Sequence, residues 1–148
     1  MHDSVVLDSS VIAPIFFPEE RTQQIMASLE DKRVITVDLA LAEVTNVAWK
    51  RCMFFHDELG VTKDALNNCI TFINDVCEVL LLKDLISDAF LDATKYSITI
   101  YDALFLAAAQ KSLVPLFTVD VKLYLKLKNN EDVVLACDQS SRTSTDLS

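Results

Sequence analysis

The segment SITIYDALFLAAAQ, residues 97–110, combines a helical pattern with an acidic residue that the pattern does not explain. Ile100, Leu104 and Ala107 recur at helical spacing, which predicts a helix packed into an interior. Asp102 lies at the start of this helix among apolar neighbours. Removing a carboxylate from water is costly unless it is paired or holds a cation. Asp102 therefore indicates a function that the helix alone does not require.

On both sides of this helix, short apolar runs rich in β-branched residues alternate with helical patterns. We predict strands at residues 4–8, 33–37, 78–82, 115–120 and 132–136. We predict helices at residues 9–16, 18–30, 39–59, 62–76, 84–96, 99–112 and 121–128. Asp38 is expected to cap the third helix, and Gly60, the only glycine, to end it. This order predicts a three-layer α/β fold with a mostly parallel sheet covered on both faces.

Length and composition describe one globular domain. The chain has 148 residues, of which 51% are hydrophobic and 24% charged. We expect a single domain over residues 1–137 and a disordered polar tail over residues 138–148. No apolar run is long enough to cross a bilayer, and the N-terminus lacks a secretory signal pattern, so we expect a cytoplasmic protein.

The charge and the cysteines exclude some classes of site. Acidic residues outnumber basic ones by 22 to 13, which gives a net charge of −9 and no long-range attraction for nucleic acid. The four cysteines form no CxxC pattern and are expected to be reduced and mostly buried. They are Cys52, Cys69, Cys77 and Cys137. Gly-rich phosphate loops and the GxSxG motif are absent, and neither His2 nor His56 is expected to be catalytic.

Four acids occupy the positions where a parallel sheet binds ligands, at or near the carboxyl ends of strands. Asp8 ends the first predicted strand, Asp120 ends the fourth, and Asp102 begins the helix before that fourth strand. Glu43 interrupts an apolar face of the helix that follows the second strand. Carboxylates that meet in one cleft repel each other unless a cation neutralises them. Oxygen ligands without His or Cys favour magnesium or manganese over zinc.

Each acid also has a simpler interpretation. Asp8 and Asp120 can cap the helices that follow them, and Asp102 can favour a helix start through the helix dipole. Glu43 can be a solvated helix residue or an ion-pair partner. These local roles do not exclude metal binding, because a capping aspartate can also hold an ion.

Four segments resemble the signature segments of the PIN-domain ribonucleases, in the same order: VVLDSSVI, AEVTNV, ITIYDALFLAAA and LFTVD. The nearest branch is that of the VapC-type toxins of toxin–antitoxin pairs. Successive acids in these segments are 35, 59 and 18 residues apart, and the resemblance spans about residues 4–135. It implies a five-stranded parallel sheet in the order 3-2-1-4-5. It also implies an endoribonuclease that depends on one or two Mg²⁺ or Mn²⁺ ions.

The resemblance assigns the metal and the catalysis to Asp8, Glu43, Asp102 and Asp120. Ser10, Asn46 and Thr118 match polar positions that orient a carboxylate or a water, although local capping explains Ser10 and Thr118 equally well. Lys50 and Lys122 are candidates for RNA contacts, with a solvated helix surface as the alternative. Ser97 departs from the family, because many relatives have glycine there.

Partners and alternative functions follow from the same residues. Trp49, Met53, Phe54 and Phe55 exceed what one helix face can bury and predict an exposed interface. The resemblance implies a homodimer, an RNA substrate and an antitoxin.

The alternative function is a non-enzymatic PIN-like module that binds RNA or protein, which the retention of all four acids disfavours. A phosphoryl-transfer domain with Asp8 as nucleophile is a weaker alternative, because the following DSS sequence lacks a second acid.

Overall fold

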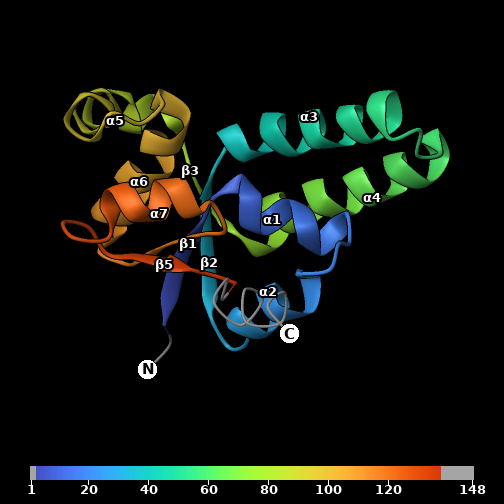
Figure 1. Cartoon of the computed structure of the whole chain (residues 1–148), viewed down its shortest axis with the longest axis horizontal. Helices are drawn as coiled ribbons and strands as arrows, with labels where there is room; N and C mark the ends of the chain where they lie inside the picture. Colours follow the sequence, from blue (N-terminus) through green and yellow to red (C-terminus); the bar gives the residue numbers. More distant parts are fainter. Residues whose placement is uncertain (1–2, 138–148) are drawn as a thin grey trace, which may run out of the picture.

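A computed structural model describes residues 3–137, which form a five-stranded parallel sheet in the order β3-β2-β1-β4-β5 (Figure 1). The strands are β1 (Ser4–Leu7), β2 (Arg33–Val37), β3 (Glu78–Leu80), β4 (Leu116–Thr118) and β5 (Val133–Leu135). The helices are α1 (Ser9–Phe16), α2 (Thr22–Ser28), α3 (Leu39–Phe54), α4 (Leu59–Thr71), the short π-helix η1 (Phe72–Val76), α5 (Leu82–Tyr96), α6 (Ile100–Ser112) and α7 (Val121–Leu127). The predicted fold class and strand order are confirmed. The predicted tail at residues 138–148 lies outside the described residues.

The central strand β1 explains why the sheet is covered on both faces. Val6 pairs with Ile35 of β2 on one side and with Leu116 of β4 on the other. Val5, Val6 and Leu7 are all buried, with at most 1% of their surface exposed. Because successive strand residues point to opposite faces, burial of all three requires packed helices on both faces of the sheet.

Two groups of helices supply this cover. Helix α6 packs against β1 and β2, and α5 packs against α6. Helix α1 contacts α2, α3 and α4, and Figure 1 shows α3 and α4 side by side as a hairpin that extends away from the sheet. Residues 103–109 of α6 are all buried, so this part of the helix is packed in the core on all sides, as its apolar ALFLAAA sequence allows. Among the described helices, none combines the length and the apolar character needed to cross a bilayer.

The prediction of one helix over residues 39–59 with an end at Gly60 is wrong. Helix α3 ends at Phe54, and the chain turns at His56, whose φ is 57°. Gly60 lies in the first turn of α4 instead, and its φ is not positive. Arg51 closes the turn, because its Nε donates to Asp57 Oδ2 at 2.7 Å. A single apolar pattern therefore spans two helices.

The apolar cluster at the end of α3 is exposed, as the sequence predicts. Trp49 is 51% exposed, Phe54 62% and Phe55 70%, and Met53 is also exposed. Trp49 and Phe54 pack edge to face, with ring centroids 5.4 Å apart. These residues, together with Leu59 and Val61 of α4, form an apolar tip on the α3–α4 hairpin.

Burial raises the pKa of Cys69 to about 11 and that of Cys77 to about 12, which keeps both thiols protonated.

Ser97 ends α5 in a left-handed conformation, with φ of 55° and ψ of 46°. This conformation explains why glycine suits the position, because a Cβ atom strains it. Ser97→Gly is expected to raise the free energy of unfolding by about 1 kcal/mol. Chemical denaturation measures this difference. Ser97→Ala keeps the Cβ and serves as the control, so an equal gain in that variant would contradict the conformational explanation.

Candidate active site

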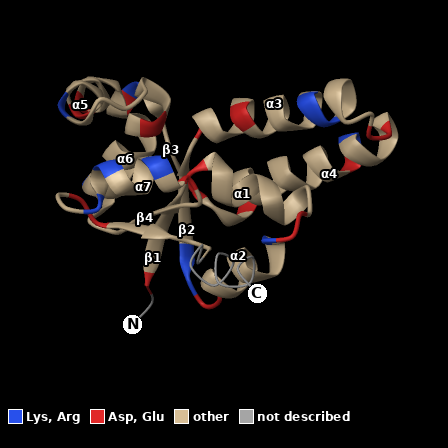
Figure 2. Cartoon of the chain, in the orientation of Figure 1, with Lys and Arg blue, Asp and Glu red and all other residues tan. Residues whose placement is uncertain are grey.

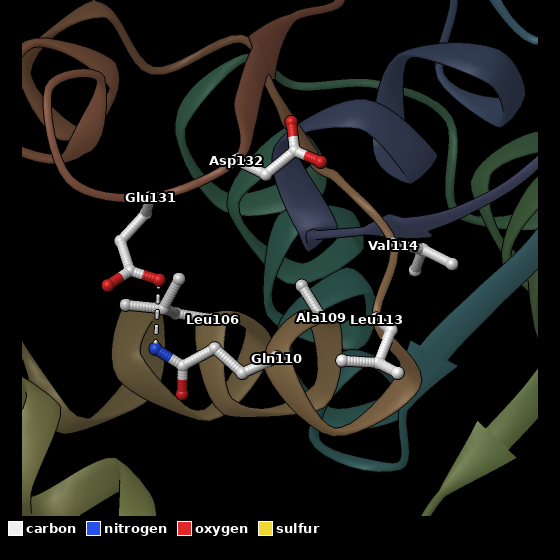
Figure 3. Close-up of a pocket in the computed structure, with 7 residues that line it drawn as sticks. All are labelled: Leu106, Ala109, Gln110, Leu113, Val114, Glu131 and Asp132. Atoms are coloured by element: carbon white, nitrogen blue, oxygen red, sulfur yellow. Dashed lines mark hydrogen bonds between the residues drawn. The ribbon is translucent and has the colours of Figure 1, made fainter.

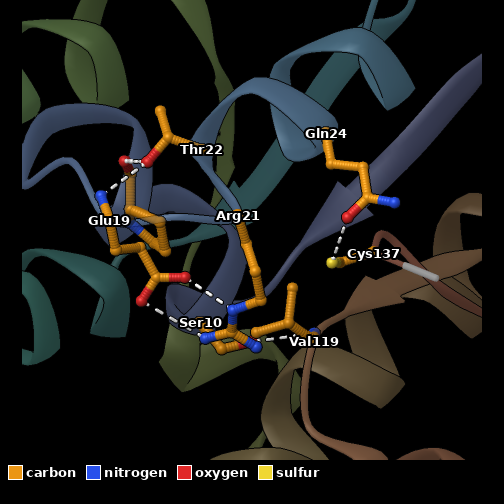
Figure 4. Close-up of polar contacts among 8 residues, drawn as sticks. Ser10, Glu19, Arg21, Thr22, Gln24, Val119 and Cys137 are labelled. Carbon is orange, nitrogen blue, oxygen red and sulfur yellow. Dashed lines mark hydrogen bonds and ion pairs between the residues drawn. The ribbon is translucent and has the colours of Figure 1, made fainter. Parts of the chain in front are cut away.

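A chain of hydrogen bonds links the carboxyl ends of β1 and β4, which are neighbours in the sheet. Asp8 directly follows β1, and its Oδ1 accepts from the backbone N of Ser10 at 3.1 Å and from Ser10 Oγ at 2.5 Å. Ser10 Oγ lies 3.3 Å from Thr118 Oγ1 and accepts from Val119 N at 3.1 Å (Figure 4). Thr118 Oγ1 also accepts from the backbone N of Asp120 at 3.1 Å. Asp8 is thus held by Ser10, which is itself anchored to the last residue of β4 and to the residue after it.

The other three acids come from three helices. Glu43 of α3 accepts from Ser9 Oγ at 2.7 Å, which ties α3 to the start of α1. Asp120 caps α7, because its Oδ1 accepts from Leu123 N at 3.1 Å. Asp102 lies in the first turn of α6, where the hydroxyl of Thr99 accepts from its backbone N at 3.1 Å. The N-cap of α6 is therefore Thr99, and Asp102 lies three residues after it in the first turn, where the helix dipole favours its negative charge.

Asp8 is the most strongly perturbed acid of the site. It is 5% exposed, and burial raises its pKa from 3.8 to about 7, with a further increase from the charge of Asp102. Hydrogen bonds from Ser10 and Thr118 oppose this increase because they stabilise the ionised form. A carboxyl group capping a helix normally ionises readily, so this environment favours either a proton or a cation beside Asp8.

Asp102 connects the charges of all four acids. Burial raises the pKa of Glu43, and the charge of Asp102 raises it further. Burial also raises the pKa of Asp102 itself, and the charge of Asp120 adds to this increase. Because Asp102 also acts on Asp8, each of the other three acids interacts with this one carboxylate. The sequence therefore identified residues that the fold brings to the same end of the sheet.

The donor chemistry of this acidic group fits a divalent cation. All four candidates offer carboxylate oxygens, and none of the ion pairs found in residues 3–137 involves them. Lys126 lowers the pKa of Asp102 by its charge, but it is one cation beside four acids. Within the part of the chain that is described, no three acidic, His or Cys side chains converge closely enough to complete an ion site. The four acids are thus related by their charges and not by a preassembled coordination shell.

Of the predicted polar and basic residues, all except the buried Thr118 line two hollows next to the acids. The larger hollow, about 540 Å³, is lined by Ser10, Glu43, Asn46 and Lys50 among others. The smaller hollow, about 200 Å³, is lined by Asp102, Asp120 and Lys122. Figure 2 shows that α7 and the distal part of α3 carry basic residues, so both hollows have a basic side despite the net negative charge.

Two further residues of these hollows, Arg21 and Tyr101, are not identified by the sequence, whereas Lys126 belongs to the basic cluster that follows Asp120. Arg21 and Tyr101 line the larger hollow, and Lys126 lines the smaller one. Lys126 Nζ donates to the carbonyl oxygen of Ser97 at 2.7 Å, which holds the lysine beside Asp102. The position of Tyr101 directly before Asp102 was the one signal available in the sequence. Arg21 gave none, because it belongs to a separate loop before α2.

A hollow of about 360 Å³ lies elsewhere, between α6 and the loop before β5 (Figure 3). Gln110 Nε2 donates to Glu131 Oε1 at 3.0 Å on its wall, and Tyr96 donates to Glu131 from α5. None of the predicted site residues lines this hollow. It is therefore not the candidate active site.

Comparison with known proteins agrees with the resemblance seen in the sequence. Residues 5–126 match the family described as PIN domain. The chain belongs to the PIN-domain family. This PIN domain is 32% identical over 124 residues to Ribonuclease VapC3 of Pyrobaculum aerophilum, a match that covers 80% of the chain and 91% of the relative. The chain therefore falls in the VapC branch of the family.

Solved structures share the fold of this PIN domain. A toxin–antitoxin complex from Klebsiella pneumoniae superimposes with a TM-score of 0.63 at 18% identity, covering 90% of this chain and 98% of that one. VapC20 of Mycobacterium tuberculosis, described as a toxin that cleaves the sarcin–ricin loop, gives a TM-score of 0.65 at 17% identity. That match covers 82% of this chain and 93% of VapC20. At these identities the similarity concerns the fold.

Proposed function

We propose that this PIN domain is an endoribonuclease that hydrolyses RNA phosphodiester bonds with Mg²⁺ or Mn²⁺, as the toxin of a toxin–antitoxin pair in the cytoplasm. The observation that carries this proposal is the electrostatic connection of Asp8, Glu43 and Asp120 to Asp102 at one end of the sheet. Family membership and the relative named a ribonuclease support the same activity. The nuclease domain comprises residues 1–137.

Each acid has a role in this proposal. Asp8 and Asp102 are the main ligands, and Glu43 and Asp120 complete one or two ion sites. When bound, the cation polarises a phosphoryl oxygen and lowers the pKa of a water molecule. Ser10 and Thr118 position the Asp8 carboxylate through their hydroxyl groups, and Ser9 positions Glu43. Asn46, Lys50 and Lys122 border the two hollows, where they contact the RNA backbone.

Cleavage of RNA by the purified protein tests the proposal. We expect hydrolysis of an RNA oligonucleotide in Mg²⁺ or Mn²⁺, loss of cleavage in EDTA, and recovery when the ion is restored in excess. Electrophoresis of end-labelled RNA measures the products. Cleavage that persists in EDTA would point to a contaminating nuclease or to metal-independent chemistry. RNA binding without cleavage under any divalent ion would favour the non-enzymatic module.

Partners bind at the exposed apolar surface in this proposal. The apolar tip of the α3–α4 hairpin is the surface offered for a second copy of the chain or for an antitoxin. A solved relative in the fold comparison is a toxin–antitoxin complex, which supports an antitoxin for this chain. Native mass spectrometry of the parent and of a Phe54→Ser, Phe55→Ser variant distinguishes a dimer from a monomer. A parent that is monomeric at high concentration would leave the antitoxin as the occupant of the tip.

A further inference from the structure

Glu131 lies outside the candidate active site, yet it joins three helices of the same layer. Its Oε1 accepts a hydrogen bond from Gln110 Nε2 of α6 at 3.0 Å (Figure 3), and its Oε2 accepts one from the hydroxyl of Tyr96, the last residue of α5. Its backbone N donates to the carbonyl oxygen of Leu127, the last residue of α7, at 2.8 Å. One residue therefore ties the end of α7 to both α5 and α6.

A second contact holds α7 against the end of α5. Lys126, in the last turn of α7, donates from Nζ to the carbonyl oxygen of Ser97 at 2.7 Å, and Ser97 directly follows Tyr96. Lys95 Nζ lies 5.1 Å from the centroid of the Tyr96 ring. The hydrogen bond to Glu131 raises the pKa of the Tyr96 hydroxyl to about 12, so this hydroxyl remains a donor at neutral pH. The last turn of α7 is thus fixed at two points.

These contacts bear on the acidic group because α6 and α7 each hold one of its members. Asp102 lies in the first turn of α6, and Asp120 caps the start of α7. Burial raises the pKa of Asp102, and the charge of Asp120 raises it further, so the two carboxylates lie close enough to repel each other. Helix α7 has seven residues and is about 10 Å long, so fixing its last turn also fixes the direction of its first.

The cluster around Glu131 does not serve stability well. Burial raises the pKa of Asp92 in α5, and the charge of Glu131 raises it further, so these two carboxylates repel each other. Asp92 Oδ2 is also buried without a hydrogen-bond partner within residues 3–137. A buried polar atom without a partner costs free energy and calls for an explanation other than stability. The placement of α7 supplies one.

We propose that Glu131 is a positioning residue of the active site, because it joins the end of α7 to α5 and α6 and thereby sets the separation at which Asp102 and Asp120 hold a divalent cation. The inference rests on the proposed function and adds a residue that contacts neither the ion nor the RNA. Without the Glu131 carboxylate, α7 loses its side-chain bonds to Tyr96 and Gln110, and Lys126 alone holds its last turn.

Binding of Mn²⁺ to the full chain without RNA tests the inference. Isothermal titration calorimetry should show a Kd weakened by about tenfold in Glu131→Ala, the lower limit for residues that orient metal ligands. Glu131→Gln removes the charge but keeps an oxygen that accepts from Tyr96, so it should recover most of the affinity. Asp132→Ala removes an exposed carboxylate at the next position and should leave Kd unchanged.

Two further variants separate positioning from stability. Tyr96→Phe removes only the hydroxyl, so it should remain folded even if Glu131→Ala does not, and it should also weaken Kd. Asp92→Asn removes the repulsion from Glu131 and should raise the midpoint of thermal unfolding without changing Kd. In cleavage assays, the Mn²⁺ concentration at half of the maximal rate should rise in Glu131→Ala by the same factor as Kd, with the maximal rate close to that of the parent.

The outcomes separate this inference from the proposed function. Unchanged Kd in folded Glu131→Ala and Tyr96→Phe overturns the inference and leaves the ribonuclease standing, even if both variants unfold at lower temperature. A Kd that weakens equally in Asp132→Ala also overturns it, because loss of negative charge then explains the effect. A parent chain that binds Mn²⁺ and cleaves no RNA, with weaker binding in Glu131→Ala, supports the positioning role and rejects the ribonuclease.

Discussion

Asp8→Asn and Asp102→Asn are expected to lose RNA cleavage by more than about a hundredfold while remaining folded. Even residues that only orient a metal ligand reduce activity by roughly 10–100-fold when replaced, so loss of a ligand should cost more. Asparagine keeps the shape of each side chain but removes the negative charge that attracts the ion. Cleavage rates under single-turnover conditions in Mn²⁺ measure the effect.

The fold should tolerate both changes. Asp8 Oδ1 accepts hydrogen bonds from Ser10 N and Ser10 Oγ, and the side-chain amide oxygen of asparagine can accept the same two bonds. Asparagine is also a good helix cap. The capping bond of α6 uses Thr99 and the backbone of residue 102, so Asp102→Asn leaves it unchanged. Circular dichroism and thermal unfolding of the purified variants check that the lost activity does not reflect unfolding.

Asp38 provides a matched control at the same edge of the sheet. It follows β2, and its Oδ1 accepts from Leu82 N at 2.8 Å, a bond that the amide oxygen of asparagine can keep. Asp38 is not one of the four acids connected through Asp102. Asp38→Asn should therefore cleave RNA nearly as fast as the parent. If Asp102→Asn does so too, the site is misassigned; if all three variants fail, general loss of charge at this edge explains the result.

The metal-free protein is expected to become less stable as the pH rises toward neutrality. Asp8 has a pKa of about 7 in the folded protein against 3.8 ordinarily, so between these values the folded chain holds a proton that the unfolded chain has lost. The contribution of this proton to the free energy of unfolding is fully present below the unfolded pKa of 3.8 and is lost as the pH rises through the folded pKa of about 7. The loss is at most about 1.4 kcal/mol per pH unit. The raised pKa values of Glu43 and Asp102 act in the same direction.

Denaturant unfolding in EDTA from about pH 5 to about pH 8 measures this loss, which should be much smaller in Asp8→Asn. Mg²⁺ or Mn²⁺ should reverse it at the higher pH, because the cation replaces the proton among the ionised carboxylates. At an ion concentration one hundred times Kd, the expected gain is about 2.7 kcal/mol. An ion that stabilises the parent and Asp8→Asn equally binds elsewhere, and parent stability that rises with pH in EDTA contradicts the environment described for Asp8.

The sheet was predictable because its signals are local. The β1 and β2 strands are short β-branched runs, and a strand buried on both faces must be apolar throughout, as Val5, Val6 and Leu7 show. The rule that parallel sheets bind ligands at the carboxyl ends of strands then marked Asp8 and Asp120. The strand order came from resemblance to a family, because no single segment records which strand lies beside it.

The errors fall at turns and loops, where individual side-chain contacts and single backbone conformations decide the outcome. The apolar pattern from Leu39 to Leu59 continues across a turn, and only the Arg51–Asp57 contact and the left-handed His56 separate α3 from α4. Arg21 lies in the loop before α2 and lines the same hollow as Glu43, a proximity that no spacing in the sequence encodes.

By itself, the sequence determined the five strands, most of the helices and the acids that lie at their ends, because periodicity and capping depend on neighbours a few residues away. Only the tertiary structure decided that the charge of Asp102 raises the pKa of Asp8 and of Glu43, and that the charge of Asp120 raises the pKa of Asp102. It also decided that Tyr101 and Arg21 line the same hollow. The physical reason is that desolvation and charge repulsion depend on distance in space, which the chain acquires only when β1 and β4 pair and their helices pack around them.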